Sequence, residues 1–364
     1  MRIHKNLMTC GIVSSILLLS ACQSFNSKTT QSSSNTSSNT SSKPSEVIQQ
    51  DSNERLFNLN TDNMMTHLKA FEKIAQQNGG YRAVGSKGGQ ASAKYIIEQA
   101  KLAGLHAQTI AFENREKTIG QNILVEIEGQ SKESAILIGA HYDSVDTGPG
   151  INDNASGVAV LIELMHQLKQ SKQKPKQTIV LAFWDSEEVG IAGSRDYVKK
   201  LTPEQLNKIK AYINVDMVGT KDPNILIADA DKSSLKDLEA QFKSAGVSES
   251  DYKPMIDGLK SLPTHSGDSA LEERLKSFFK AKNLTIREDT TTLTASDTAP
   301  FLGKVPVTSI ILFNEKERPG ANEGETILDF APCYHQACDT IEHVDPQSLK
   351  IASDAIIYLI NGIK

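Results

Sequence analysis

Short apolar runs rich in β-branched residues alternate with helical patterns along this chain, and that alternation constrains the fold more than any other feature. Six runs predict strands: Ile123–Ile127, Ala135–Gly139, Thr178–Phe183, Ala211–Val215, Asn224–Ile227 and Val307–Leu312. Apolar residues at helical spacing predict helices: Ala91–Leu102, Ala155–Leu168, Ser234–Ala245, Ala270–Ala281 and Gln347–Ile360. We therefore expect an α/β fold, a single three-layer α/β/α sandwich around a mixed, largely parallel central sheet.

Chemically active side chains follow three of these strands directly. His141 and Asp143 come after the second predicted strand, Glu187 and Glu188 after the third, and Asp216 ends the fourth. Ligands of open α/β sheets gather at the carboxyl ends of the strands. We therefore expect these side chains to lie close together.

Two further segments carry groups of the same kind. Asp153 lies in an Asn-Asp-Asn segment that opens a helix, and Tyr334 and His335 lie between two cysteines. Each segment alone has an ordinary explanation, such as a helix cap or a solvated acidic pair. Gathered at one sheet edge, however, the carboxylates would repel one another unless a cation neutralised them.

The number of these groups predicts the number of cations. Two histidines and three carboxylates are too many for one tetrahedral ion, but they suffice for two ions if one carboxylate bridges them. Imidazole and carboxylate ligands without cysteine suit zinc, with cobalt or manganese as substitutes.

The N-terminus has the pattern of an export signal. Arg2 and Lys5 precede a mostly apolar run over 7–19, which is too short for a comfortable membrane span. The run ends in Leu-Ser-Ala-Cys, which resembles the bacterial lipoprotein box, in which the chain is cut before the cysteine and Cys22 is acylated. Ordinary cleavage nearby is the alternative. We expect a signal peptide over 1–21, a disordered Ser/Thr/Asn-rich tether over 22–53 and a catalytic domain over 54–364.

Composition and cysteine use agree with an exported enzyme. The 364 residues carry a net charge of −5 and no basic run, which argues against a nucleic-acid partner. Besides Cys10 in the signal and Cys22, the chain has only Cys333 and Cys338. In an oxidising compartment these two predict a disulfide, with two free thiols as the alternative. We expect a monomer.

Four stretches together resemble a known family. They read AHYDSVDTGPGINDNASGVA, FWDSEEVGIAGS, NVDMVG and CYHQACDT. They are similar to the co-catalytic di-zinc aminopeptidases of peptidase family M28, close to the secreted bacterial leucine aminopeptidases, and the likeness runs from Arg82 to the final helix. The resemblance implies the zinc exopeptidase fold, two zinc ions per chain and peptide substrates with a free N-terminus.

The resemblance also implies a ligand set. His141 and Asp216 would bind the first zinc ion, and Glu188 and His335 the second. Asp153 would bridge both ions, and the peptide bond that follows it would be cis.

The same resemblance implies four supporting roles. Asp143 would hold the far nitrogen of His141, and Glu187 would be the general base. Tyr334 would stabilise the oxyanion. Met217 would line an apolar pocket for the substrate side chain, with core packing as the alternative.

One stretch departs from the family pattern. Some relatives have Arg and His around a Ser-Asp pair, where this chain has Ala295 and Thr298. This departure concerns peptide recognition and side-chain preference, not hydrolysis.

Three other functions remain possible. A glutaminyl cyclase shares the fold but works with one zinc ion, and a co-catalytic carboxypeptidase would carry an inserted lid. A catalytically inactive peptide-binding lipoprotein is the third. Because Gln23 rather than aspartate follows Cys22, the anchor points to the outer membrane of the bacterial cell envelope.

Overall fold

The computed structural model describes residues 58–319 and 326–363, which belong to one compact unit. The predicted signal peptide, the lipidated Cys22, the tether over 22–53 and the first residues of the domain that was predicted to begin at 54 lie outside the described residues. Within the described ranges, no helix has the length and apolar character needed to cross a membrane.

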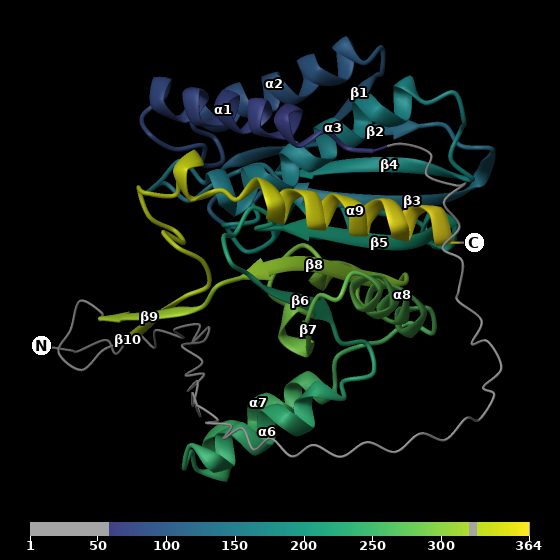
Figure 1. The fold of residues 1–364 in the computed structure, drawn as a ribbon. Coiled ribbons are helices and arrows are strands. Elements are labelled where there is room, and N and C mark those ends of the chain that lie inside the picture. Colours follow the sequence, from purple (N-terminus) through teal and green to yellow (C-terminus); the bar gives the residue numbers. More distant parts are fainter. Residues whose placement is uncertain (1–57, 320–325, 364) are drawn as a thin grey trace, which may run out of the picture. The chain divides into compact units, whose positions relative to one another are not determined.

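A mixed eight-stranded sheet forms the centre of the fold (Figure 1). Its strands are β1 (Ala107–Glu113), β2 (Ile119–Ile127), β3 (Ser131–His141), β4 (Gln177–Trp184), β5 (Ile209–Asp216), β6 (Asn224–Ala228), β7 (Ile286–Asp289) and β8 (Val307–Phe313). They lie in the order β1-β2-β4-β3-β5-β8-β6-β7. The central strands β4, β3, β5 and β8 run parallel. Strand β1 pairs antiparallel with β2, β2 with β4, and β6 with β8, whereas β6 and β7 pair parallel. A separate hairpin consists of β9 (Lys316–Pro319) and β10 (Thr326–Asp329).

Nine helices are described around this sheet within 58–319 and 326–363. They are α1 (Thr61–Gln77), α2 (Lys87–Leu102), α3 (Ser156–Gln170), α4 (Ala192–Lys200), α5 (Pro203–Lys208), α6 (Ser234–Ser244), α7 (Glu249–Lys260), α8 (Asp268–Ala281) and α9 (Pro346–Gly362). Local sequence sets several of their ends. The side chains of Asn60 and Asp345 accept backbone N–H groups at the starts of α1 and α9, as expected of N-cap residues.

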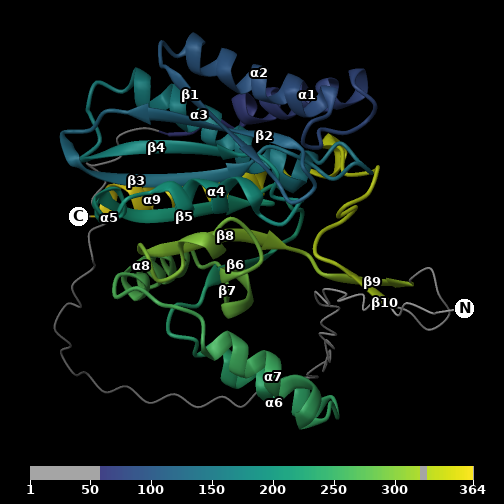
Figure 2. The same cartoon turned by 180° about the vertical axis from the view of Figure 1, so that it is seen from behind.

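Alternating side chains of the strands point to two different cores. Ile136 and Ile138 of β3 pack in the core that α1, α2, α3, α8 and α9 cover, whereas Leu137 packs in the core on the opposite face, with α4. Figure 1 shows α9 in front of the sheet, and Figure 2 shows α4 and α5 on its other side. The three-layer α/β/α sandwich predicted from the sequence is thus confirmed.

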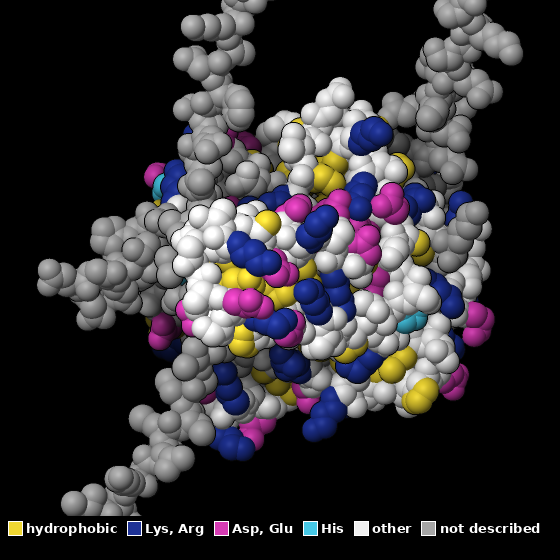
Figure 3. Space-filling model, turned by 90° about the horizontal axis from the view of Figure 1, so that it is seen from below, with side chains coloured by type: hydrophobic (Ala, Val, Ile, Leu, Met, Phe, Trp, Pro, Cys, Tyr) yellow, Lys and Arg dark blue, Asp and Glu magenta, His cyan; other side chains and the backbone are white. Residues whose placement is uncertain are grey.

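The pair α6 and α7 extends beyond the sheet edge at β7 in both ribbon views. Its own contacts include the stacked rings of Phe242 and Tyr252, whose centroids are 5.5 Å apart. Figure 3 looks onto this side of the molecule and shows basic (Lys or Arg) and acidic (Asp or Glu) side chains interspersed. Among the described residues on this face, the two signs of charge are therefore mixed.

Four parallel strands determine where the candidate site lies. Because β3, β4, β5 and β8 are parallel, the ends of the first three, at His141, Trp184 and Asp216, meet at one edge of the sheet. This edge is where a ligand site is expected in an open α/β sheet.

Candidate active site

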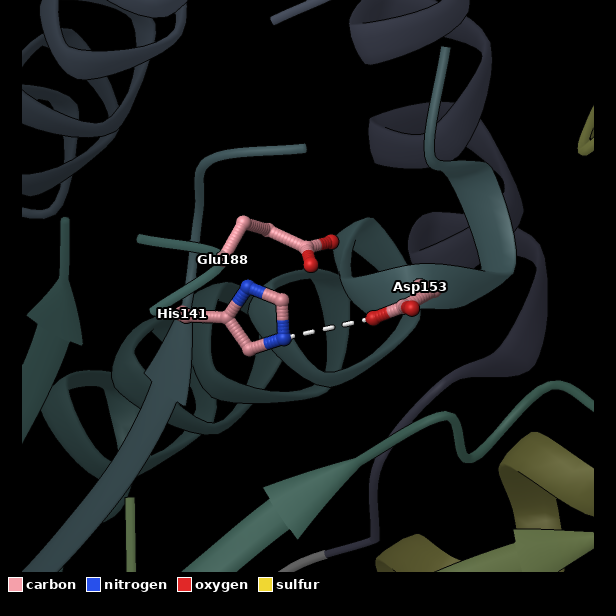
Figure 4. Close-up of side chains that lie close together, drawn as sticks. All are labelled: His141, Asp153 and Glu188. Carbon is pink, nitrogen blue, oxygen red and sulfur yellow. Dashed lines mark ion pairs between the residues drawn. The ribbon is translucent and has the colours of Figure 1, made fainter. Parts of the chain in front are cut away.

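Two histidines lie against the carboxylate of Asp153, one on each of its oxygens, and each histidine lies against one further carboxylate. Oδ1 of Asp153 lies 3.3 Å from Nε2 of His141, and that nitrogen is 3.5 Å from Oδ1 of Asp216. Oδ2 of Asp153 lies 3.2 Å from Nε2 of His335, and that nitrogen is 3.1 Å from Oε2 of Glu188. Figure 4 shows His141, Asp153 and Glu188 pointing toward one another. The five residues predicted as ligands therefore come together, as two sets that share Asp153.

The donor atoms of these sets suit divalent cations. Oε1 of Glu188 and Oδ1 of Asp216 are buried and have no hydrogen-bond partner within the described part of the chain. One donor atom each of His141, Asp153 and Glu188 lies within 4.8 Å of the others. A buried carboxylate oxygen without a partner is costly unless a cation meets it, and imidazole and carboxylate are ligands that zinc takes. The residues present fit a pair of zinc ions.

The carboxylates of this site raise the pKa of both histidines. Burial lowers the pKa of His335, but its hydrogen bonds to Asp153 and Glu188 outweigh burial and raise that pKa to about 10. Burial likewise opposes a charged His141, yet Asp216, Asp143 and Asp153 raise its pKa well above the ordinary value. The electrostatic field of the site therefore favours cations.

Asp143 connects the segment that carries His141 with the loop that carries Glu187 and Glu188. Its Oδ1 is 3.5 Å from Nδ1 of His141, and its backbone carbonyl is 3.2 Å from the same nitrogen. The two carboxylate oxygens also accept the backbone N–H groups of Glu187 and Glu188, at 3.1 and 3.3 Å. Asp143 lies beside the far nitrogen of His141, the position that the family resemblance implied, and it additionally holds the loop that carries both glutamates.

Glu187 lies in an irregular loop between β4 and α4, so that its side chain and that of Glu188 need not splay as they would on a helix. Burial raises the pKa of Glu187 well above its ordinary value; His141 opposes this, and the carboxylates of Glu188, Asp297 and Asp216 reinforce it. The raised pKa makes this carboxylate a stronger proton acceptor than an exposed glutamate.

Tyr334 and His335 lie on a cross-linked loop. A disulfide joins Cys333 and Cys338, as predicted, and the backbone of Cys333 and His335 has positive φ, 63° and 56°. The ring of Tyr334 stacks on that of His335 with centroids 3.8 Å apart. The Thr147 hydroxyl donates to the His335 carbonyl at 2.8 Å. The loop is thus held at both ends and in the middle.

The hydroxyl of Tyr334 stays protonated. Burial raises its pKa well above the ordinary value, and the carboxylates of Asp153, Glu188 and Glu187 raise it further. A protonated phenol beside the carboxylates of both ligand sets can donate a hydrogen bond to an oxygen that becomes negative.

Asp339 is a site residue to which the sequence analysis assigned no role. Its carboxylate accepts the backbone N–H groups of Asn152 and Asp153, at 2.8 and 3.1 Å. It lies one residue after Cys338, at the end of the stretch that carries His335, and that acidic position was the available signal. The peptide bond between Asp153 and Asn154 is cis, as the family resemblance implied.

Arg82 is a second residue of this kind. It is fully buried, and its guanidinium donates to the backbone carbonyls of Tyr142, Pro149 and Gly150. Burial lowers its pKa to about 10, although the carboxylates of the site oppose this shift. Arg82 therefore fastens both ends of the segment between His141 and Asp153.

Met217 follows Asp216 and is only 4% exposed. It packs in a small apolar cluster with Leu226, Ile311, Phe313 and Ala331, against which Phe330 and Tyr334 lie. Core packing thus accounts for most of its surface, while the contact of its cluster with Tyr334 keeps it beside the site.

Known proteins resemble this chain in sequence. Residues 122–360 match the family described as peptidase family M28. Leupeptin-inactivating enzyme 1 of Streptomyces exfoliatus is 28% identical over 82% of this chain and 60% of its own length. A Mycobacterium tuberculosis protein named "Probable lipoprotein aminopeptidase LpqL" is 30% identical over 70% of this chain and 47% of its own length. The chain spans about half the length of such curated relatives.

Solved structures share the fold. A zinc aminopeptidase from Bacillus subtilis superposes with a TM-score of 0.60 at 16% identity, over 84% of this chain and 95% of its own. A glutaminyl cyclase from Bacteroides thetaiotaomicron superposes with a TM-score of 0.59 at 18% identity, over 84% of this chain and 99% of its own. The fold is therefore common to two activities, and it is the sequence match over 122–360, which includes all five residues of the cluster, that decides the family. This chain belongs to peptidase family M28.

Proposed function

We propose that this chain is a zinc aminopeptidase that hydrolyses the N-terminal peptide bond of peptides. The observation that carries the proposal is the position of Asp153, whose two carboxylate oxygens face two separate ligand sets. His141 and Asp216 would complete one zinc position, and His335 and Glu188 the other. A zinc pair held there would supply Lewis acidity and make a water molecule acidic enough to lose a proton near neutral pH.

The protein's own groups would then move the protons. Glu187, with its raised pKa, would accept a proton from the attacking water and pass it to the amine that leaves. The Tyr334 hydroxyl would donate to the former carbonyl oxygen as that oxygen gains negative charge. Asp143 keeps the glutamate loop and His141 in register throughout.

The charge of the site favours the N-terminal end of a peptide. Glu187 and Asp216 remain beside the zinc positions and attract a protonated α-amine, whereas a C-terminal carboxylate would be repelled. The apolar cluster around Met217 and Tyr334 supports a preference for apolar N-terminal side chains. Rates on leucyl-, lysyl- and glutamyl-p-nitroanilide measure that preference, and a glutamyl rate equal to the leucyl rate would contradict it.

A metal and substrate assay tests the proposed activity. We expect two zinc ions per purified chain, loss of activity in phenanthroline and recovery on zinc addition. Leucine should be released from leucyl-p-nitroanilide, without cyclisation of a glutaminyl peptide. Cyclisation in place of hydrolysis would make the chain a glutaminyl cyclase, and intact zinc sites with neither reaction would make it a binding protein.

We further propose that the protein is anchored to the bacterial envelope, in the outer membrane, by lipid on Cys22. The apolar run before Cys22 and the name of the mycobacterial relative support this. In cells given labelled palmitate, the wild type should take up label and fractionate with outer membranes. A Cys22→Ser protein should take up none, and label in that variant would contradict the proposal.

A further inference from the structure

A chain of buried hydrogen bonds ends on one of the proposed metal ligands. Nε1 of Trp184 in β4 donates to the Tyr212 hydroxyl in β5 at 3.0 Å, and that hydroxyl donates to Oδ1 of Asn214 at 3.0 Å. Nδ2 of Asn214 donates to the Ser296 hydroxyl at 3.0 Å. The Ser296 hydroxyl in turn donates to Oδ2 of Asp216 at 2.7 Å.

The direction of this chain follows from its first member. An indole nitrogen only donates, so Tyr212 accepts from Trp184 and keeps its own proton free for Oδ1 of Asn214. Asn214 then turns its NH₂ group to Ser296, which leaves the Ser296 proton for Asp216. Trp184 and Tyr212 are 0% exposed, Asn214 1% and Ser296 2%, so no bulk water reaches the chain to reverse it.

Gly139 leaves room for the first hydrogen bond of this series, between Trp184 and Tyr212. A Cβ atom on Gly139 of β3 would lie 2.3 Å from Nε1 of Trp184 and 2.6 Å from the Tyr212 hydroxyl. The Tyr212 ring also stacks on Phe301, with centroids 3.8 Å apart. The tyrosine hydroxyl is therefore fixed by packing as well as by hydrogen bonding.

The last link decides which oxygen of Asp216 is available. Ser296 occupies Oδ2, whereas Oδ1 is buried, has no hydrogen-bond partner among the residues described, and lies 3.5 Å from Nε2 of His141. The oxygen of Asp216 that this series of hydrogen bonds leaves unoccupied is thus the one on the side of the first proposed zinc position.

We propose that Tyr212 and Asn214 are positioning residues that act through Ser296 to hold Asp216 with Oδ1 toward the cation it shares with His141. The inference rests on the proposed function, because it concerns the same metal pair. Neither residue would touch the substrate, and neither was singled out by the sequence patterns. Groups that orient a metal ligand from behind typically contribute 10- to 100-fold in metal affinity.

Metal titration of full-length variants tests the proposal. Tyr212→Phe removes only the hydroxyl, and Asn214→Leu keeps the approximate shape of the amide. We expect each to weaken one of the two zinc ions by about tenfold or more in competition with a chromophoric chelator, while the other ion binds as in the wild type. Equal weakening of both ions, or of neither, would overturn the proposal.

Ser309→Ala is the matched control. Ser309 of β8 lies opposite Asn214 in the sheet register, and its buried hydroxyl has no hydrogen-bond partner in the described structure. Removing this hydroxyl should leave both zinc affinities unchanged. A loss of zinc affinity as large as that of Tyr212→Phe would show that any substitution here disturbs the metals, and would overturn the proposal.

A double-mutant cycle tests the route. If Tyr212 acts through Ser296, Tyr212→Phe should cause no further loss of zinc affinity in a Ser296→Ala protein; additive losses would contradict this route. The proposed function fails separately: a wild type that binds two zinc ions but cleaves no aminoacyl substrate refutes the aminopeptidase and leaves the positioning result intact. A wild type that binds no zinc pair refutes both.

Discussion

The carboxylate of Asp339 accepts the backbone N–H of Asp153 at 3.1 Å, across 186 residues of sequence. Its other oxygen accepts the N–H of Asn152, so one buried side chain fixes two successive peptide groups. The residue proposed to bridge both zinc ions is therefore held by its backbone from the loop that carries His335. The two ligand sets are linked by this contact as well as by Asp153 itself.

Replacing Asp339 by asparagine should weaken its contacts with the backbone of Asn152 and Asp153. The amide keeps the shape but turns an NH₂ group toward one of the two N–H donors, at a cost of about 1–3 kcal/mol in the free energy of unfolding. Zinc affinity should fall roughly 10- to 100-fold. Chemical denaturation and chelator competition measure the two effects.

Asp229→Asn is the control for that substitution. Asp229 is equally buried and also accepts two successive N–H groups, those of Ser233 and Ser234, away from the zinc ligands. The Asp229→Asn protein should have a lower free energy of unfolding but an unchanged zinc affinity. Should both variants lose zinc equally, the contact between Asp339 and Asp153 would have no special bearing on the metals.

Glu187→Gln should abolish turnover while preserving metal content. Glutamine fills the same space but cannot accept the proton, and loss of a general base typically costs 10²- to 10⁴-fold in kcat. KM and zinc stoichiometry should stay close to wild type. A variant as active as the wild type would refute the assignment of Glu187 as the base, and Glu126→Gln, on β2 away from the loop, serves as the inert comparison.

Loss of the disulfide should affect the metals more than the fold. The short loop from Cys333 to Cys338 limits the entropic stabilisation to about 2 kcal/mol. Cys333 and His335 both have positive φ, which non-glycine residues seldom adopt, so the free loop would leave this conformation readily. The doubly substituted Cys333→Ser, Cys338→Ser protein should bind one zinc ion at least several-fold more weakly, as measured by chelator competition. Unchanged affinity for both ions would contradict this role of the cross-link.

His67 should make the fold sensitive to acid. Burial, with a smaller contribution from His166, lowers the pKa of His67 to about 4. The unfolded chain binds this proton near pH 6.5, so between pH 6.5 and 4 it holds more protons than the folded chain. The free energy of unfolding should therefore fall as the pH drops through this range, by about 3 kcal/mol from this group.

A variant isolates that contribution. His67→Gln keeps a polar partner for the Tyr95 hydroxyl, which lies 2.7 Å from Nδ1 of His67. Denaturation midpoints of the variant should decline less than those of the wild type between pH 6.5 and 4. His106→Gln, at an exposed histidine, should decline like the wild type, and identical pH profiles for all three proteins would refute the assignment.

The central strands could be read from the sequence because burial on both faces leaves a nearly continuous apolar run, as in Ala135–Gly139 of β3. The edge strand β7 could not, because its sequence, Ile-Arg-Glu-Asp, is mostly charged. Arg287 of β7 is instead stabilised by an ion pair with Glu315 at 2.6 Å. Helix α7 was not predicted, because Pro254 and Gly258 both disfavour a helix. The stacking of Tyr252 on Phe242 of α6 supports the helix in the folded protein.

The site shows the same division. His141, Glu188 and Asp216 follow predicted strands, so their convergence could be anticipated from the direction of those strands, whereas Asp153 and His335 were placed with them by the family resemblance. Asp339 and Asn214 act on groups brought near only by the folded chain, and an aspartate or asparagine in a loop or strand carries no local mark of such a partner. The family resemblance therefore named the five clustered residues and Asp143, but not Asp339 or Asn214.

The order of the ligands along the chain has a consequence for biogenesis. His141, Asp153 and Asp216, which make up one set, are synthesised long before His335, which completes the other. A polypeptide that ends before the cysteine loop contains every residue of the first set and lacks His335 of the second. The second proposed zinc position would therefore be completed only when the carboxy-terminal segment has packed against the sheet, and the proposed activity would depend on that folding step.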